Sequence, residues 1–244
     1  MTFGRAVKKA IKEYLRQYGF KYKDYSFRTP HNEDMTFYFY YADETHFRPQ
    51  YYYVKMAAKI TSLHLSNILN DLTEGKLYYM DNPSYVGPMF QMTTTGTDII
   101  HSEFFGSRDM EENMAEFKHV FETTILPIYE KYSCQKTLFT CAIHDKPAIK
   151  WCRIAQHYIP LAYYFESRFD EMFQYVNERL NFFKDSMVDI SRLSEQIDIR
   201  NAIITNLQCS EQMYILSIMR RNLQIWVEDK RVFKVDDEYL PVFK

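Results

Sequence analysis

The spacing of apolar residues divides the chain into a mixed first part and a second part with helical periodicity. Apolar residues recur every three or four positions in residues 3–18, which predicts an amphipathic helix that Gly19 ends in a left-handed conformation. From Ser107 onward the chain contains no glycine, and the helical period continues almost throughout. We therefore predict an α+β protein, with an antiparallel sheet and flanking helices in residues 1–131 and a mainly helical region packed on it in residues 132–244. The two parts are either separate domains or one continuous domain.

Alternation of apolar and polar residues predicts strands after the first helix. Residues 20–28 alternate until Asp24, where the phase shifts, which predicts a bulge or bend. Residues 35–41 and 50–60 follow as two longer strands. A further hairpin is predicted within residues 90–105.

Capping residues and prolines mark the predicted helix ends. Ser62 is placed to cap a short helix that Gly75 ends. Ser107 opens a longer helix that Pro127 bends or ends, and Pro160 separates two helices further on. The last two predicted helices cover residues 190–207 and 212–227.

Aromatic residues are dense on the two long strands of a chain that contains 21 tyrosines and 19 phenylalanines. Alternation assigns Tyr38, Tyr40, Tyr51 and Tyr53 to one face of the sheet. Tyrosine combines a large contact area with a polar hydroxyl, so this face is predicted to bind a partner protein. Cover by the chain's own helices is the alternative. The opposite face is predicted to enter the core through Phe37, Phe39, Tyr41, Tyr52 and Val54.

Charge and hydropathy narrow the class of protein. With 30 basic and 32 acidic residues the net charge is -2, which removes a global attraction to nucleic acid. The basic residues of the first helix fit a solvated face better than a phosphate-binding stripe. The longest apolar stretches, such as residues 159–165, are far shorter than the roughly 20 residues that span a bilayer. We expect a soluble cytoplasmic protein with no membrane segment and with reduced cysteines.

Four residues have the right chemistry for a zinc site. Cys141, His144, Cys152 and His157 lie within seventeen positions and carry thiol or imidazole ligands. Their spacing matches no zinc pattern, because Cys152 and His157 fall five residues apart in a predicted helix. Buried thiols and exposed imidazoles are the favoured interpretation, and no cofactor is expected.

Catalysis has one local candidate among the seven histidines. His101 and Glu103 are two residues apart in a predicted strand, which puts both side chains on one face, where a carboxylate can orient an imidazole. An exposed strand face is the alternative interpretation. An enzyme with a pocket between the sheet and the helical region is therefore the second hypothesis for function, after a non-catalytic binding protein.

The first half to two-thirds of the chain is similar to a bacterial family. The opening helix, the Gly19-Phe20-Lys21 step into a strand and the strands Met35–Tyr41 and Tyr51–Ile60 resemble a family of uncharacterised domains. Some members of that family look like immunity proteins encoded near polymorphic toxins. The resemblance implies a binding protein without a cofactor, one that neutralises a cognate toxin by direct contact, and it transfers no active-site residue. This chain departs from such domains in its long helical continuation after Cys134.

Overall fold

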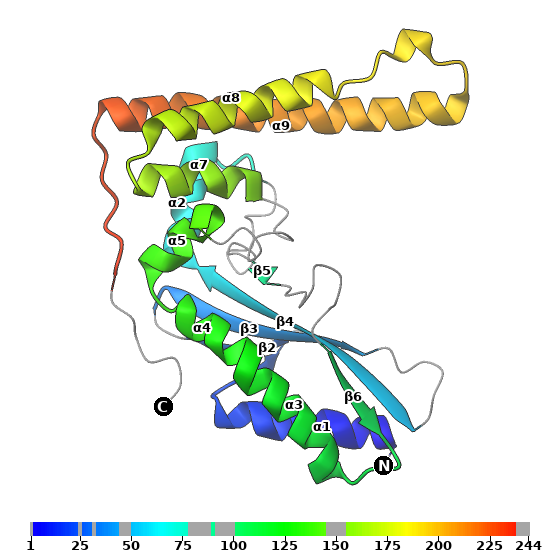
Figure 1. Cartoon of the computed structure of the whole chain (residues 1–244). Coiled ribbons are helices and arrows are strands. Elements are labelled where there is room, and N and C mark those ends of the chain that lie inside the picture. Colours follow the sequence, from blue (N-terminus) through cyan, green and yellow to red (C-terminus); the bar gives the residue numbers. More distant parts are fainter. Residues whose placement is uncertain are drawn as a thin grey trace.

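The computed structural model has an antiparallel sheet with helices on one face and a stack of helices at one end (Figure 1). This arrangement confirms the predicted α+β class. The structure describes residues 2–23, 26–30, 33–43, 50–77, 89–90, 101–144 and 155–237.

All strand pairs in the sheet are antiparallel. Neighbouring strands follow the order β1-β2-β3-β4, and β5 and β6 both pair with β4. The alternation that predicted β3 and β4 is confirmed, with Phe37 opposite Ile60 and Phe39 opposite Ala58. The strands are β1 (Lys21–Lys23), β2 (Ser26–Pro30), β3 (Met35–Asp43), β4 (Tyr51–Ser62), β5 (Met89–Phe90) and β6 (His101–Phe105).

The phase shift at Asp24, from which a bulge or bend was predicted, falls between two strands that pair antiparallel. Tyr22 of β1 lies opposite Phe27 of β2, so the two segments form an antiparallel pair joined through residues 24 and 25, which lie outside the described chain. A change of strand shifts the parity of inward-facing residues as a bulge does. The aromatic pattern alone therefore could not distinguish a bulge within one strand from a change to a second strand.

The described parts of β5 and β6 are not two arms of one hairpin. Phe90 lies opposite Ala58 and His101 lies opposite Lys55, and both strands run antiparallel to β4. They therefore follow the same edge of β4 in the same direction. The predicted hairpin partners in residues 91–100 fall outside the described chain.

Helices cover the face of the sheet that carries Phe37 and Phe39. The ring of Phe39 lies 6.1 Å from that of Phe117 and 5.5 Å from that of Phe121, and Phe37 stacks on Tyr129 at 4.9 Å. Phe37, Phe39, Tyr52 and Val54 are buried as predicted, whereas the side chain of Tyr41 is not described. The covering elements are α1 (Phe3–Gln17), α3 (Met110–Val120), a π-helical turn (Phe121–Ile125) and α4 (Leu126–Lys131).

Pro127 does not end the helix that precedes it. Proline has no N–H to donate to the carbonyl four residues earlier. The helix takes a π-helical turn just before it, in which the Leu126 N–H donates to the carbonyl of Phe121, five residues earlier. The helix also begins two residues later than predicted. Its N-cap is Asp109, whose carboxylate accepts from the Glu112 N–H at 2.8 Å.

The remaining helices stack at one end of the sheet (Figure 1). Ser62 caps the first of them as predicted, since its hydroxyl accepts from the Leu65 N–H at 3.0 Å, and Gly75 follows the helix with φ +70°. The stack consists of α2 (Leu63–Thr73), α5 (Gln135–His144), α7 (Ala155–Phe165), α8 (Phe169–Asp185), a 3₁₀ turn (Ile190–Arg192) and α9 (Gln196–Glu228).

Two predicted helix boundaries are wrong. Pro160 lies inside α7, and the chain instead turns between α7 and α8 at Ser167, which has φ 57°. The predicted break between residues 207 and 212 is absent, because α9 is one helix of 33 residues. Cys209 in the middle of that stretch is buried, so tertiary packing holds the helix together there.

Buried side chains connect the sheet to the helical region. One hydrophobic cluster contains residues of α1, the sheet, α2 and α9. The amide of Asn222 in α9 also donates to the carbonyl of Leu72 in α2 at 3.0 Å. None of the helices described is long and apolar enough to cross a bilayer.

Candidate functional site

Two of the predicted tyrosines lie at the edge of the sheet beside β6. Tyr51 and Tyr53 are half-buried on the face of β4 that points away from α1 and α3. The register places Tyr51 opposite Phe105 and Tyr53 opposite Glu103. We call the group formed by Tyr51, Tyr53, Glu103, Phe105 and Arg108 the β4–β6 surface.

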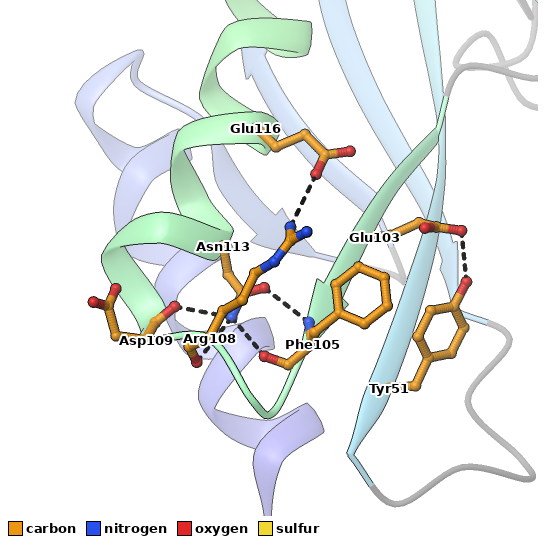
Figure 2. A network of polar contacts seen from close by, with 7 residues as sticks. All are labelled: Tyr51, Glu103, Phe105, Arg108, Asp109, Asn113 and Glu116. Carbon is orange, nitrogen blue, oxygen red and sulfur yellow. Dashed lines mark hydrogen bonds and ion pairs between the residues drawn. The ribbon is translucent and has the colours of Figure 1, made fainter.

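Tyr51 is fixed by two contacts with β6 (Figure 2). Its hydroxyl donates to the Glu103 carboxylate at 2.8 Å, and its ring lies 5.4 Å from the ring of Phe105 at an angle of 58°. Diagonal and directly opposite neighbours on one face are the pairs that stabilise a sheet. The tyrosine hydroxyl and the aromatic edge are therefore held in one orientation at the surface.

Arg108 extends the same surface beyond the end of β6. Its guanidinium group lies 4.7 Å from the centre of the Phe105 ring, and it faces the Glu116 carboxylate of α3 at 3.8 Å. Cation–π contact with the ring and the nearby carboxylate both restrict this long side chain. The result is a row in which Tyr51, Phe105 and Arg108 lie in succession.

Asn113 of α3 fixes the backbone under this row. Its side-chain oxygen accepts from the Phe105 N–H at 2.8 Å, and its amide group donates to the Phe105 carbonyl at 2.9 Å. The same amide group is 2.9 Å from the carbonyl of Asp109 and 3.3 Å from that of Arg108. Asn113 is fully buried, so it satisfies backbone groups that would otherwise lie unpaired at the outer edge of β6.

Two more carboxylates border the β4–β6 surface, those of Asp109 at the start of α3 and Glu116 within it. The residues drawn in Figure 2 include the carboxylates of Glu103, Asp109 and Glu116 against the single guanidinium of Arg108. The row offers rings, a hydroxyl and fixed charges. Aromatic rings and arginine are enriched at protein–protein interfaces, so these groups suit recognition of another protein surface.

Tyr38 does not belong to this surface, contrary to the expectation that its side chain is exposed. It is only 6% exposed, and its carbonyl oxygen accepts from the hydroxyl of Tyr129 at 2.7 Å. Tyr38 lies opposite Lys59, six residues along β4 from Tyr53, which corresponds to about 20 Å. The side chain of Tyr40 is not described. The four predicted tyrosines therefore do not gather in one place.

The catalytic candidates lie on β6. The Glu103 carboxylate accepts a hydrogen bond from the Tyr51 hydroxyl, and the side chain of His101 is not described. A carboxylate and imidazole working together at these two positions stays a prediction.

Three of the four metal candidates lie in described helices, two in α5 and one in α7. Cys141 is buried in α5, and the exposed His144 at the end of that helix pairs with Glu166. His157 is buried in α7, and Cys152 lies outside the described chain. Within the part of the chain that the structure describes, no three histidine, cysteine, aspartate or glutamate side chains are placed to hold a metal ion.

Two surface hollows lie within the helical region. Lys136, Phe165 and Val235 are among the residues that line the first, and Gln156 and Gln212 are among those that line the second. Neither of these hollows lies between the sheet and the helices, where the enzyme hypothesis places its pocket.

Sequence reasoning missed Arg108 and Asn113. A signal for Asn113 was present, because it lies three and four residues from Met110 and Phe117 on the apolar stripe of the helix. A polar side chain at a core position needs hydrogen-bond partners, and here these are the backbone groups of Phe105. Arg108 carried no comparable signal.

Comparison of the chain with protein-family models, with curated proteins and with solved structures finds no match. The similarity to a bacterial family of immunity-like domains therefore stays an expectation, and the candidate site is interpreted from its own chemistry.

Proposed function

We propose that this chain is a non-catalytic protein that binds a partner protein through the β4–β6 surface. The observation that supports the proposal is the row of Tyr51, Phe105 and Arg108, which is accessible and yet held by contacts within the chain. Tyrosine and arginine are enriched among residues that dominate binding energy. Because these side chains are already ordered, association loses little side-chain entropy.

The charge of the surface indicates the chemistry of the partner. Glu103, Asp109 and Glu116 outnumber Arg108, so a partner with basic side chains around an apolar group is the best complement. Attraction between exposed charges is screened by salt, and the association rate is expected to fall as ionic strength rises. The resemblance noted from the sequence adds a more specific proposal, in which the partner is a bacterial toxin that the chain neutralises in the cytoplasm by covering its active site.

Where a toxin-like reading frame lies next to the gene for this chain, its product is the partner with which the proposal is tested. The two proteins are co-purified, and affinity is measured by calorimetry for wild type, Tyr51→Ala and Phe105→Ala. We expect each substitution to weaken binding at least about tenfold, as removal of a central aromatic contact does.

Tyr22→Ala provides a matched control. Tyr22 is also an exposed tyrosine on the sheet, at 45% exposure, but it lies on β1 at the opposite edge. It should leave the affinity unchanged. Equal losses for Tyr22→Ala and Tyr51→Ala, or none for either, would refute the assignment of the site.

A further inference from the structure

The α8–α9 pair extends beyond the rest of the molecule as a helical arm. Figure 1 shows the end of α8 and the beginning of α9 projecting past α2 and α7. Of the twelve large apolar side chains that are exposed in the described chain, eight lie between residues 182 and 214. An apolar surface of this extent away from the core is typical of an interaction site.

Four of these side chains form one stripe along α9. Ile197, Ile204, Leu207 and Tyr214 are 66%, 44%, 66% and 57% exposed. They are separated by seven, three and seven residues, which is the spacing of a and d positions in a coiled coil. The first half of α9 therefore presents a narrow apolar seam.

The seam faces away from α8. Asn206 accepts from the Val188 N–H at 2.7 Å and donates to the Val188 carbonyl at 2.9 Å, so this side of α9 lies against the segment that follows α8. Further along, Arg220 donates to Asn177 of α8 at 2.9 Å from the same side of α9. Ala202 and Cys209 are buried on the same side of the helix.

Further along α9 the same seam is covered. Ile218 continues it by one more turn and is only 6% exposed, at the end of α9 where Asn222 bonds to the carbonyl of Leu72 in α2. The seam is thus apolar both near Ile218, where α2 lies beside α9, and in residues 197–214, where its side chains are exposed.

The two remaining seam positions carry opposite charges. Arg200 lies between Ile197 and Ile204, Glu211 lies between Leu207 and Tyr214, and both charged side chains are exposed. They are 11 residues apart on one helix, or about 16 Å, which is too far for them to pair with each other.

We infer that the arm binds the arm of a second copy of this chain, with the two α9 helices antiparallel. A two-fold axis between residues 205 and 206 places Ile197 beside Tyr214 of the second copy and Ile204 beside Leu207 of the second copy. The same axis places Arg200 beside Glu211 of the second copy, and symmetry repeats each contact. In an antiparallel pair an a position packs beside a d position, so every seam residue meets a complementary one.

The pattern favours a copy of the chain over an unrelated protein. The seam has one positive and one negative position at equal distances from its centre. When a second copy of α9 runs in the opposite direction, apolar residues therefore meet apolar residues and each charge meets the opposite charge. The net charge of -2 adds little repulsion between copies. The second copy's α9 begins at Gln196, which falls opposite Ile215, so the shared segment ends before Ile218 is reached.

The length of the contact sets its strength. Residues 197–214 span about 27 Å of helix, which is a small interface for two helices. The dimer is therefore expected to dissociate on dilution, with an apparent mass that falls from twice the chain mass of 29.5 kDa toward that mass.

The test is a charge exchange followed by sedimentation of the full chain over about a hundredfold range of concentration. Arg200→Glu puts a glutamate beside Glu211 of the second copy, and Glu211→Arg puts an arginine beside Arg200. Each substitution should weaken dimerisation at least about tenfold. An equimolar mixture of the two variants should dimerise like wild type, because every ion pair is then restored, and so should the double exchange.

Arg5→Glu in α1 is the matched control, since it makes the same change of charge on an exposed residue far from the arm, and it should leave the dimer intact. Thermal unfolding followed by circular dichroism checks that the exposed substitutions keep the fold. A monomeric wild type, single variants that dimerise like wild type, or a mixture that stays monomeric would each overturn the inference. None of these measurements involves the β4–β6 surface, so the proposed function stands or fails separately.

Discussion

The hydroxyl of Tyr129 in α4 donates a 2.7 Å hydrogen bond to the carbonyl oxygen of Tyr38 in β3. The ring that carries this hydroxyl is fully buried and stacks on Phe37 at 4.9 Å. A single residue thus joins a helix to a central strand of the sheet by packing and by a polar contact. The strand that Tyr129 contacts is β3, which carries Tyr38, one of the tyrosines that were predicted to bind a partner.

Tyr129→Phe separates the two contributions. The substitution keeps the ring and removes the donor to the Tyr38 carbonyl, so the free energy of unfolding should fall by about 1 kcal/mol. Tyr129→Leu also removes the ring from the core and should cost about 3 kcal/mol. Urea unfolding followed by fluorescence measures both. A Tyr129→Phe variant as stable as wild type would show that the hydrogen bond contributes nothing.

Asn113→Asp tests the support under the β4–β6 surface. The change keeps the shape of the side chain but replaces the amide donor by an oxygen, which then faces the carbonyls of Phe105 and Asp109. We expect a loss of about 3 kcal/mol at neutral pH, because a buried, charged oxygen then faces carbonyl oxygens to which the amide group had donated. The loss should shrink in acid, where a protonated carboxyl can donate again.

Asn181→Asp is the control for this change. It introduces the same chemistry at an exposed position of α8, and surface substitutions of this kind stay within about 0.5 kcal/mol. If Asn113→Asp were equally mild at neutral pH, the backbone of Phe105 would not depend on Asn113. Binding through the β4–β6 surface should weaken with the loss of this support, since Phe105 and Arg108 lie directly above it.

Local patterns predicted the parts of the fold that local physics controls. The alternation in β3 and β4 follows from the two-residue period of a strand with one buried face, and the cap at Ser62 depends on a hydrogen bond three residues away. The breaks predicted at Pro160 and near residue 210 failed. Packing of α7 against other helices offsets the cost of about 3 kcal/mol for a proline inside a helix, and packing of α9 outweighs the weaker local preference near residue 210.

The candidate site shows the same limit more sharply. Alternation correctly placed Tyr51 and Tyr53 on the face away from Phe39, but it assigned Tyr38 to that face without showing that its side chain is buried. Cover by distant segments is a tertiary property that no spacing rule contains. The contacts that fix the site, from Arg108 and Asn113, likewise depend on how α3 meets β6.

Glu74 makes the contact between α2 and α9 sensitive to acid. Its carboxylate accepts from the side chains of Asn222 and Arg221, and the Asn222 hydrogen bond followed by that of Arg221 holds the pKa of Glu74 below its usual value. The pKa is lower in the folded than in the unfolded state, so the stabilisation is present above the unfolded pKa of about 4.3 and is lost as the pH falls through the folded value.

Glu74→Gln isolates this contribution. The variant cannot carry the charge, so it should be less stable than wild type at pH 7, and the difference should shrink as the pH falls below about 4.3. Urea unfolding of both proteins across this range measures it, with Glu111→Gln, a change at an exposed glutamate of α3, as the matched control. A difference that stays constant with pH would mean that shape at position 74, and not its charge, joins the two helices. Because Glu74 is exposed, added salt should reduce the difference at pH 7 as well, since screening weakens the ion pair with Arg221.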